Sequence, residues 1–451
     1  MKRLNNFPYS HVLVLGLAKS GTAAAQLLLQ SRIKVRVNDM NAKESDADVI
    51  ALRQKGAEVI VGSHPLSALD GIDLIVKNPG IPYEHSLIEL ALQQDIRIIT
   101  EIELAYQLAK QHHLIGITGS NGKTTTTMLV YEILKQSKVP VKLAGNIGIV
   151  ATEVAQQLQA DEQLLLELSS FQLLGTEQFR PHIACLLNLY DAHLDYHHTI
   201  ESYEMAKSQV FMNQTAEDYL VYNQDDEKVV HLIKSAQARL IPFSTKSNLT
   251  EAGAWTDGVA LYFKDEQIIK LKDVALVGEH NIENMLAAIS IAKTSGATNE
   301  SIGEVLKRFS GVDHRLQYVT EIAGRSFYND SKATNILATQ KALQSFESPT
   351  ILLAGGLDRQ EDFTMLIPYL KHVKALITFG ETKEKLAAVA RDSNIANIHI
   401  VKDIREATKL AFTLSVGGDT ILLSPACASW DQYKTFEERG DMFIQTVHTL
   451  A

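Results

Sequence analysis

Short apolar runs alternate with helical patterns along almost the whole of this 451-residue chain, and this alternation restricts its fold more than any other feature. Each apolar run is typical of a buried strand, and the stretch after it is typical of a helix that crosses back over a parallel sheet. The pattern starts three times, at HVLVLGLAKSG, at LIGIT and at VDHRLQYV. We therefore predict an α/β fold of three domains. These domains would span residues 1–101, 102–311 and 312–451.

The second start contains a glycine-rich turn between a predicted strand and a predicted helix. Residues 118–125 read TGSNGKTT, although Ile117 stands where the usual phosphate-loop pattern has glycine. Such a turn aims backbone N–H groups and the positive end of a helix at one point, and a polyphosphate suits that point best. Lys123 adds a full charge, and the Thr124 hydroxyl can bind Mg²⁺. The turn predicts an ATP site in a central α/β domain of the P-loop ATPase type, whose segment 240–273 alternates like antiparallel hairpins.

Charge and cysteine content exclude several classes of function. The net charge is −10 with acids and bases interleaved, so no basic face for nucleic acid is expected. No apolar run approaches the length of a membrane span, and no secretion signal is visible. Cys185 and Cys427 lie far apart in apolar runs and indicate reduced core residues. We expect a cytoplasmic enzyme, a monomer with small-molecule substrates and no membrane or nucleic-acid partner.

The first start also carries a glycine turn. Gly16, Ala18 and Gly21 occupy the positions of a dinucleotide-binding fingerprint, and Asp39 ends the next strand, where an acid would meet a ribose or base. Ala18 replaces the middle glycine and would keep the backbone further from a pyrophosphate. A packing glycine in a tight turn is therefore the alternative. If the site is real, this Rossmann-like domain holds a second nucleotide or a nucleotide-bearing substrate.

Three further residues are candidates for metal binding or activation. Glu167 closes a strand of leucines, where a buried acid needs a partner or a metal ion. His193 lies in a polar loop after another apolar run, and a surface histidine is the alternative. Lys207 lies inside a helical stretch, where lysines are usually solvated. Together with ATP, these residues fit transfer of a γ-phosphate to a carboxylate and attack by an amine, with two metal ions to neutralise charge.

The chain resembles the Mur ligases, the ATP-dependent amide-forming enzymes of peptidoglycan synthesis, over essentially its whole length. The motifs that carry the resemblance are TGSNGKTT, GNIG, ELSSFQL, HNIENMLAA, DHR, NDSKATN and SPACASWDQ. NDSKATN and SPACAS are similar to those of the branch that adds D-glutamate. The resemblance implies ATP, Mg²⁺ and two small-molecule substrates, UDP-N-acetylmuramoyl-L-alanine and D-glutamate. It also implies an acyl-phosphate intermediate and a Rossmann-like C-terminal domain that binds the amino acid and closes the cleft.

The resemblance also implies roles for individual residues. Those implied to be catalytic are Lys123, Glu167, His193, Lys207 and Lys332. Those implied to bind ATP are Gly119, Ser120, Asn121, Gly122, Lys123, Thr124, Thr125, Asn146, Asn281, Asn284, Arg315 and Asp330. The implied metal ligands are Thr124, Glu167, His193 and Lys207, the last if it is carbamylated. The implied UDP-sugar residues are Gly16, Ala18, Lys19, Ser20, Asp39, Asn78 and Gly80. The implied D-glutamate residues are Thr334, Arg359, Ser429 and Phe436. Arg359 stands where the family often has lysine, and it would bind a carboxylate bidentately.

Two other functions fit part of the chain. A ligase similar to folylpolyglutamate synthase shares the ATP core and adds glutamate, but it has no need of a UDP-binding domain at residues 1–100. A phosphate-loop ATPase or kinase would bind ATP without an amine site. Release of phosphate that depends on both the UDP-sugar and D-glutamate would separate the three functions.

Overall fold

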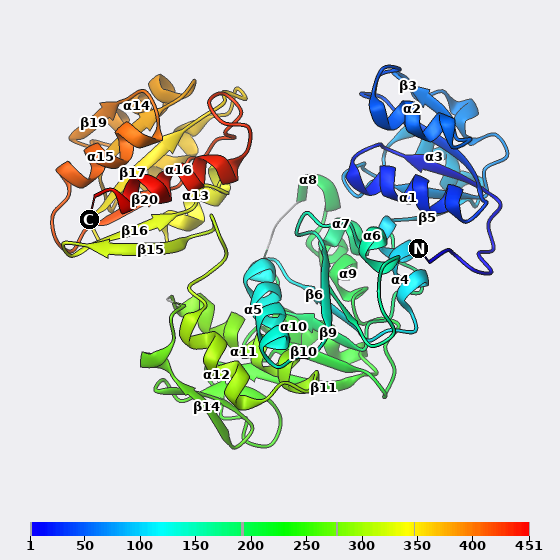
Figure 1. Ribbon diagram of the computed structural model, residues 1–451, viewed down its shortest axis with the longest axis horizontal. Helices are drawn as coiled ribbons and strands as arrows, with labels where there is room; N and C mark the ends of the chain where they lie inside the picture. Colours follow the sequence, from blue (N-terminus) through cyan, green and yellow to red (C-terminus); the bar gives the residue numbers. More distant parts are fainter. Residues whose placement is uncertain (1, 191–193, 277, 347, 451) are drawn as a thin grey trace. The chain divides into compact units, whose positions relative to one another are not determined.

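The strands of the chain form three separate sheets (Figure 1). The computed structural model describes residues 2–190, 194–276, 278–346 and 348–450. Two sheets lie in one compact unit, Met1–Phe309, and the third lies in a second unit, Ser310–Ala451. The predicted α/β class is confirmed, while the domain boundaries near residues 101 and 311 stay predictions.

The first sheet is fully parallel, with strand order β3-β2-β1-β4-β5. Its strands are β1 (His11–Leu15), β2 (Lys34–Asp39), β3 (Glu58–Val61), β4 (Leu74–Lys77) and β5 (Arg97–Ile99). The accompanying helices are α1 (Lys19–Gln30), α2 (Ala47–Gln54), α3 (Ser86–Gln93) and α4 (Glu101–Ala109), with a 3-10 turn η1 (Leu66–Leu69). Because the order reverses at β1, a crevice opens at the carboxyl ends of β1 and its neighbours, where such sheets bind ligands.

The second sheet carries the phosphate loop in its parallel part. Its strands are β6 (Leu114–Thr118), β7 (Val141–Gly145), β8 (Gln163–Glu167), β9 (Ile183–Leu186), β10 (Tyr219–Asn223), β11 (Arg239–Ser244), β12 (Ala254–Thr256), β13 (Ala260–Phe263) and β14 (Glu266–Lys270). Its helices are α5 (Lys123–Gln136), α6 (Ala151–Ala155), α7 (Ser170–Leu173), α8 (Leu194–His197), α9 (Ile200–Ser208), α10 (Glu227–Leu232), α11 (Glu279–Thr294) and α12 (Asn299–Arg308). Helices α5, α11 and α12 pack together on one face (Figure 1), where they share a core with Ile115, Ile117 and Leu165.

The prediction of antiparallel hairpins across 240–273 is wrong for its first part. Strand β11 pairs in parallel with both β10 and β12. The reason is the connection, since α10 crosses the sheet between β10 and β11 and returns the chain in the same direction. Only β12, β13 and β14 pair antiparallel, as successive hairpins at the edge of the sheet.

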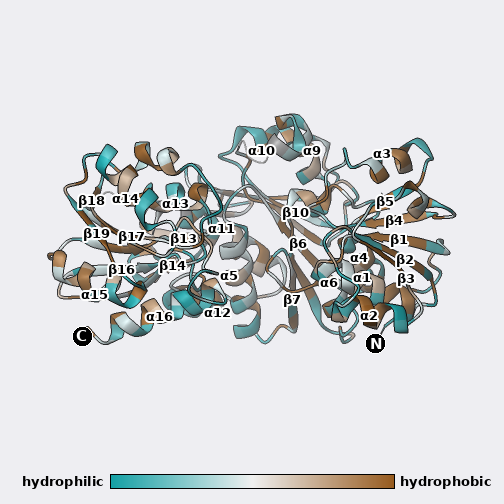
Figure 2. Ribbon diagram, turned by 90° about the horizontal axis from the view of Figure 1, so that it is seen from above, coloured by the Kyte–Doolittle hydropathy of each residue, from teal (hydrophilic) through white to brown (hydrophobic). Residues whose placement is uncertain are grey.

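The third sheet has the order β15-β16-β20-β17-β18-β19, with β15 antiparallel at its edge. Its strands are β15 (Gln317–Ile322), β16 (Arg325–Asn329), β17 (Thr350–Gly355), β18 (Val373–Phe379), β19 (Asn397–Ile400) and β20 (Thr420–Leu423). Its helices are α13 (Ile336–Leu343), α14 (Lys383–Asp392), α15 (Ile404–Leu414) and α16 (Phe436–His448), with a 3-10 turn η4 (Phe363–Tyr369). Alternate strand residues face α13 and α14 on one side and α15 and α16 on the other. Both faces are therefore apolar, as the brown strands of Figure 2 show.

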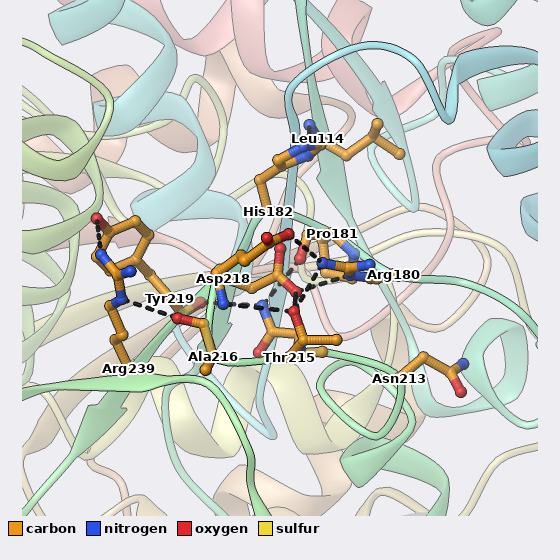
Figure 3. A network of polar contacts seen from close by, with 12 residues as sticks. Leu114, Arg180, Pro181, His182, Asn213, Thr215, Ala216, Asp218, Tyr219 and Arg239 are labelled. Atoms are coloured by element: carbon orange, nitrogen blue, oxygen red, sulfur yellow. Dashed lines mark hydrogen bonds and ion pairs between the residues drawn. The ribbon is translucent and has the colours of Figure 1, made fainter.

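A polar network lies at the amino ends of three parallel strands of the second sheet, β6, β9 and β10 (Figure 3). Asp218 precedes β10 and accepts hydrogen bonds from Arg180 Nε at 2.7 Å and from the Thr215 backbone N–H at 2.8 Å. Nearby, His182 precedes β9, and its ring accepts from the backbone N–H of Leu114 at 3.3 Å. The network connects the amino-terminal ends of β6, β9 and β10, so its role is to stabilise the fold.

Replacing Asp218 with alanine should lower the free energy of unfolding by about 2 kcal/mol, because hydrogen bonds to a buried charge are lost. Only 2% of the Asp218 side chain is exposed. Chemical denaturation measures the loss. The matched control is Glu217→Ala, since that side chain is 86% exposed and also pairs with Arg180. The control should change stability by less than about 0.5 kcal/mol. Equal losses in the two variants would contradict a structural role for Asp218.

No helix in the described part of the chain is long and apolar enough to cross a membrane.

Candidate functional site

The phosphate loop connects β6 to α5. Gly122 is the residue before α5 and has a φ of 80°, and a Cβ atom there would lie 2.1 Å from Asn284 Oδ1. A side chain would be strained in this backbone conformation and would also clash, so glycine is required. Within the described residues, no side chain caps the start of α5, and the first turn has no acid. Its backbone N–H groups are thus available to an anion.

Residues from two later loops hold the phosphate loop in place. Asn188 follows β9, and its Oδ1 accepts from the backbone N–H of Asn121 at 2.8 Å. The Tyr203 hydroxyl, from α9, lies 2.8 Å from Ser120 Oγ. Neither Asn188 nor Tyr203 was predicted from the sequence. Tyr203 could have been found, because it lies four residues before Lys207 and so on the same face of the helix.

Two lysines converge on one carbonyl of this loop. Lys123 Nζ donates to Gly119 O at 2.9 Å and to Ser120 O at 2.9 Å. Lys207 Nζ donates to the same Gly119 O at 2.8 Å. The alternative of a solvated Lys207 is wrong, since the side chain is 1% exposed and its ammonium lies over the Tyr203 ring. Burial first, and then the charge of Lys123, lower the pKa of Lys207 well below the usual value.

Glu167 lies at the end of β8 with one of its oxygens unsatisfied. Oε1 accepts from Asn146 Nδ2 at 2.9 Å, and the Asn146 backbone N–H donates to Glu167 O at 2.8 Å. Oε2 is buried and has no hydrogen-bond partner among the described residues. A buried carboxylate oxygen of this kind is costly unless an ion or a donor completes it.

These oxygens fit a magnesium ion. Mg²⁺ prefers carboxylate and hydroxyl oxygens with phosphate oxygens and water, and Glu167 and Thr124 can supply the protein ligands. Lys207 fits only if its charge is removed, since an ammonium repels the ion. In the described segments no group of three His, Cys, Asp or Glu side chains could hold a metal ion. The predicted ligand His193 lies outside the described residues.

Asn281 and Asn284 start α11 beside the phosphate loop. Asn284 Nδ2 donates to Asn281 Oδ1 at 3.0 Å, and Thr126 Oγ1 donates to Asn284 Oδ1 at 3.4 Å. The structure therefore brings both residues to the loop, and their expected contact with adenine stays a prediction. Thr125 lies half-buried in the first turn of α5.

The residues predicted for the UDP-sugar gather at the crevice of the first sheet. Gly16 has a φ of 94°, and a Cβ atom there would lie 2.9 Å from Asn78 Cβ. Ala18 and Lys19 are exposed at the start of α1, where no described side chain caps the helix. Beside them, Asn78 Nδ2 lies 3.5 Å from Ser20 Oγ. The start of this helix is thus open to a phosphate group.

Asp39 has a structural role at the same crevice. Its Oδ2 accepts from the Leu17 backbone N–H at 2.6 Å, and its Oδ1 accepts from Asn41 and Ala42 at 2.7 and 2.8 Å. Burial raises the pKa of Asp39, but these three bonds outweigh that effect and lower it overall. Asn78 Oδ1 accepts from Gly80 at 3.1 Å and shapes the next loop.

In the second unit, buried Arg439 joins three loops at the carboxyl ends of β16, β17 and β20. Its guanidinium donates to Ser331 O at 2.9 Å, to Cys427 O at 3.0 Å and to Gly355 O at 3.3 Å. Burial lowers the pKa of Arg439 to about 10. Sequence reasoning missed this residue, because a single arginine in a helix carries no motif.

These loops carry the residues predicted for D-glutamate. Lys332 Nζ lies 5.6 Å from the centre of the Phe436 ring, and the Thr334 backbone N–H donates to Lys332 O at 2.9 Å. Ser429 Oγ is buried without a hydrogen-bond partner among the described residues. Arg359 is exposed and stacks on Trp430 at 5.0 Å, so its side chain can turn toward a ligand.

Asp330 is a buried acid between these loops. Its Oδ2 accepts from Ser424 Oγ at 2.8 Å, and its Oδ1 accepts from the Leu316 backbone N–H at 3.1 Å. Burial raises the pKa of Asp330 to about 7, although these bonds and the charge of exposed Arg315 oppose the rise. Whether Arg315, Asp330 and Lys332 reach ATP stays a prediction.

The raised pKa of Asp330 predicts a pH-dependent stability. Its ordinary value is 3.8, so unfolding releases a proton between about pH 4 and pH 7. The stabilising contribution of the protonated form is complete below about pH 4 and is lost as the pH rises to about 7. Calorimetry should show the wild type losing stability relative to Asp330→Asn over that range. Asp392→Asn, at an exposed position, is the control variant, and a pH dependence of Asp330→Asn equal to that of the control would refute the assignment.

Comparison with known proteins finds similarity to Mur ligases along the chain. Three family models match: "Mur ligase MurD-like, N-terminal domain" at residues 10–100, "Mur ligase middle domain" at 117–292, and "Mur ligase, glutamate ligase domain" at 314–427. A protein of Oceanobacillus iheyensis is 58% identical over 450 residues, covering 100% of both chains. One from Bacillus subtilis is 54% identical over 442 residues, covering 98% of each. Both are named UDP-N-acetylmuramoylalanine–D-glutamate ligase.

Solved structures support the fold. A MurF structure from Acinetobacter baumannii has a TM-score of 0.60 at 17% identity, covering 96% of this chain and 93% of that one. The MurF ligase of Thermotoga maritima, solved in complex with ADP, has a TM-score of 0.57 at 17% identity and covers 93% of this chain and 96% of that one.

Proposed function

This chain belongs to the Mur ligase family, and we propose that it joins D-glutamate to UDP-N-acetylmuramoyl-L-alanine with ATP, a step of peptidoglycan synthesis. The observation that carries the proposal is that relatives 52–58% identical over nearly the full length are named as this ligase. A function like that of folylpolyglutamate synthase, or a simple kinase, is not favoured, because residues 10–100 match the N-terminal domain model of MurD-like enzymes.

The reaction has two chemical stages. The alanyl carboxylate attacks the γ-phosphate of ATP, which gives an acyl phosphate and ADP. The amine of D-glutamate then attacks the acyl carbon, and phosphate leaves as the amide forms. The protein must neutralise the transferring phosphate and hold the reactants in line. Lys123 and the N–H groups at the start of α5 are suited to the first task.

We assign Mg²⁺ to the buried Glu167 oxygen and the Thr124 hydroxyl, with His193 and carbamylated Lys207 completing two ion sites. The ions would offset charge on the phosphates during transfer. The Lys207 ammonium first loses a proton, and the neutral amine then bonds to CO₂ with release of a second proton, so a cation becomes an anion. The crowding of Lys207 against Lys123 supports this assignment, because the modification replaces a repulsion with an attraction.

The crevice of the first sheet is assigned to the UDP-sugar and the loops around Arg439 to D-glutamate. The start of α1, which no described side chain caps, supports the first assignment. The Ser429 hydroxyl, which has no hydrogen-bond partner among the described residues, supports the second. We further propose that the enzyme works as a monomer in the cytoplasm, which size-exclusion chromatography and cell fractionation test.

Phosphate release with each substrate omitted in turn tests the function. The expected result is release that requires ATP, UDP-N-acetylmuramoyl-L-alanine and D-glutamate together, with an amide product of matching mass. Release without the UDP-sugar or without D-glutamate would favour an ATPase. Formation of ADP without free phosphate would favour a kinase, and no release with all three substrates would leave a folate-type ligase.

A further inference from the structure

Loop 78–81, which follows β4 at the crevice of the first sheet, is built around a buried cation. Lys77 is 1% exposed, and its ammonium donates to Ile81 O at 2.7 Å, Pro79 O at 3.2 Å and Asn78 O at 3.3 Å. The loop therefore wraps the side chain of the residue that precedes it. Its conformation depends on three charge-assisted hydrogen bonds to backbone carbonyls.

Tyr196 of α8, a helix that accompanies the second sheet, also contacts loop 78–81. Lys77 Nζ donates to the Tyr196 hydroxyl at 3.0 Å. That hydroxyl in turn lies 3.0 Å from Ile81 O and 3.1 Å from Pro79 O, which share its proton. The Tyr83 ring lies 4.9 Å from the ammonium and covers it on another side. Loop 78–81 is thus fastened to the helical segment that precedes α9.

Ring contacts continue from Tyr196 to the phosphate loop. The Tyr196 ring lies 4.5 Å from Phe171 and 5.1 Å from His197, centre to centre. His197 lies 5.3 Å from Tyr203, whose hydroxyl reaches Ser120 Oγ at 2.8 Å. Helices α7 and α8, which supply these rings, both pack against α9 (Figure 1). An unbroken series of contacts therefore joins loop 78–81 to the loop proposed to bind ATP.

The free-energy cost of burying the Lys77 ammonium indicates that this residue has a role beyond stability. In the described part of the chain, no carboxylate forms an ion pair with its ammonium, and burial lowers its pKa to about 8. A well-packed apolar side chain of similar size would avoid this desolvation penalty. What the cation supplies is a particular arrangement of three carbonyls and one hydroxyl.

We propose that Lys77 is a positioning residue, which sets loop 78–81 for the UDP-sugar and, through Tyr196, couples that loop to the phosphate loop. The inference rests on the proposed function in one respect, since it takes loop 78–81 as part of the UDP-sugar site. Neither the Lys77 nor the Tyr196 side chain is required to touch a reacting atom.

The test compares Lys77→Met with the exposed control Lys55→Met in the full-length enzyme. Lys77→Met should raise the KM for the UDP-sugar about tenfold, because charge-assisted bonds that shape its loop are lost. The KM for D-glutamate should stay unchanged, as should all constants of Lys55→Met. Binding of a non-hydrolysable ATP analogue, measured with and without the UDP-sugar, should show mutual enhancement in the wild type and a ratio near one in Lys77→Met.

Tyr196→Phe provides a milder variant that removes only the hydroxyl. It should raise the same KM about threefold, and the double variant should be less impaired than the product of the two effects, because the groups touch. If Lys77→Met fails to fold, Tyr196→Phe carries the test.

An unchanged KM for the UDP-sugar in both variants would overturn the proposal, as would equal increases for all three substrates or the absence of enhancement in the wild type. A wild type that releases no phosphate with the three substrates would instead refute the proposed function. The two failures are therefore distinguishable.

Discussion

Lys123→Ala is expected to lower the rate of amide formation by about a thousandfold or more, since charge on the transferring phosphate loses its nearest cation. Lys123 is the first residue of α5, and its ammonium lies against the phosphate loop, 2.9 Å from both Gly119 O and Ser120 O. Both ADP and amide product should fall together. A coupled assay for ADP and mass spectrometry of the product measure the two quantities.

Lys135→Ala is the matched control for this substitution. Lys135 lies in the last turn of the same helix, is 54% exposed and pairs with Glu132 at 4.0 Å. Its loss should leave turnover within about twofold, since exposed ion pairs contribute little. Near-normal ADP formation by Lys123→Ala, in a variant whose melting temperature matches the control, would exclude the assignment of ATP to this loop.

Lys207→Met is expected to lower turnover by about a hundredfold, because the proposed carbamate on this side chain would be lost from the proposed ion site. Burial and the charge of Lys123 lower the pKa of Lys207, so more of this side chain is the neutral amine, the form that reacts with CO₂, than in an exposed lysine. The carbamate should therefore persist to lower pH than one on an exposed lysine. Labelling with ¹³C-bicarbonate and carbon NMR should detect it in the wild type.

The exposed lysine Lys234 supplies the control. Lys234→Met should keep both the NMR signal and the activity, whereas Lys207→Met should lose both. Removing dissolved CO₂ should slow the wild type, and bicarbonate should restore it. Full activity in CO₂-free buffer, with no labelled lysine, would show that Lys207 acts as an ammonium.

Much of the fold could be read from local patterns. The run KVRVND predicted β2 within its observed bounds, Lys34–Asp39, and LIGIT predicted β6, Leu114–Thr118. Buried parallel strands are continuous apolar runs, so they stand out from their neighbours. The direction of β11 was mistaken because period-two alternation is the same in parallel and antiparallel strands. Only the intervening helix α10 distinguishes them.

The residues of the candidate site also fall into those that a local pattern predicts and those that it does not. Residues with a local motif, such as Gly122 and Lys123, could be predicted, because the turn itself carries the pattern of an anion site. Tyr203, Asn188 and Arg439 were missed, since each acts on a loop distant in sequence through one or two hydrogen bonds. No periodicity or composition records such contacts.

The order of the residues was enough to establish the α/β class, the phosphate loop and the family, because short-range geometry and local motifs carry these features. The burial of individual charged side chains could be established only from the folded structure. It made Lys207 a crowded, desolvated amine in place of a solvated one and left one Glu167 oxygen without a partner among the described residues. It also enclosed Lys77 within its own loop. Desolvation and the partners of a charge depend on what packs around it in three dimensions, and that is set by segments far away in the chain.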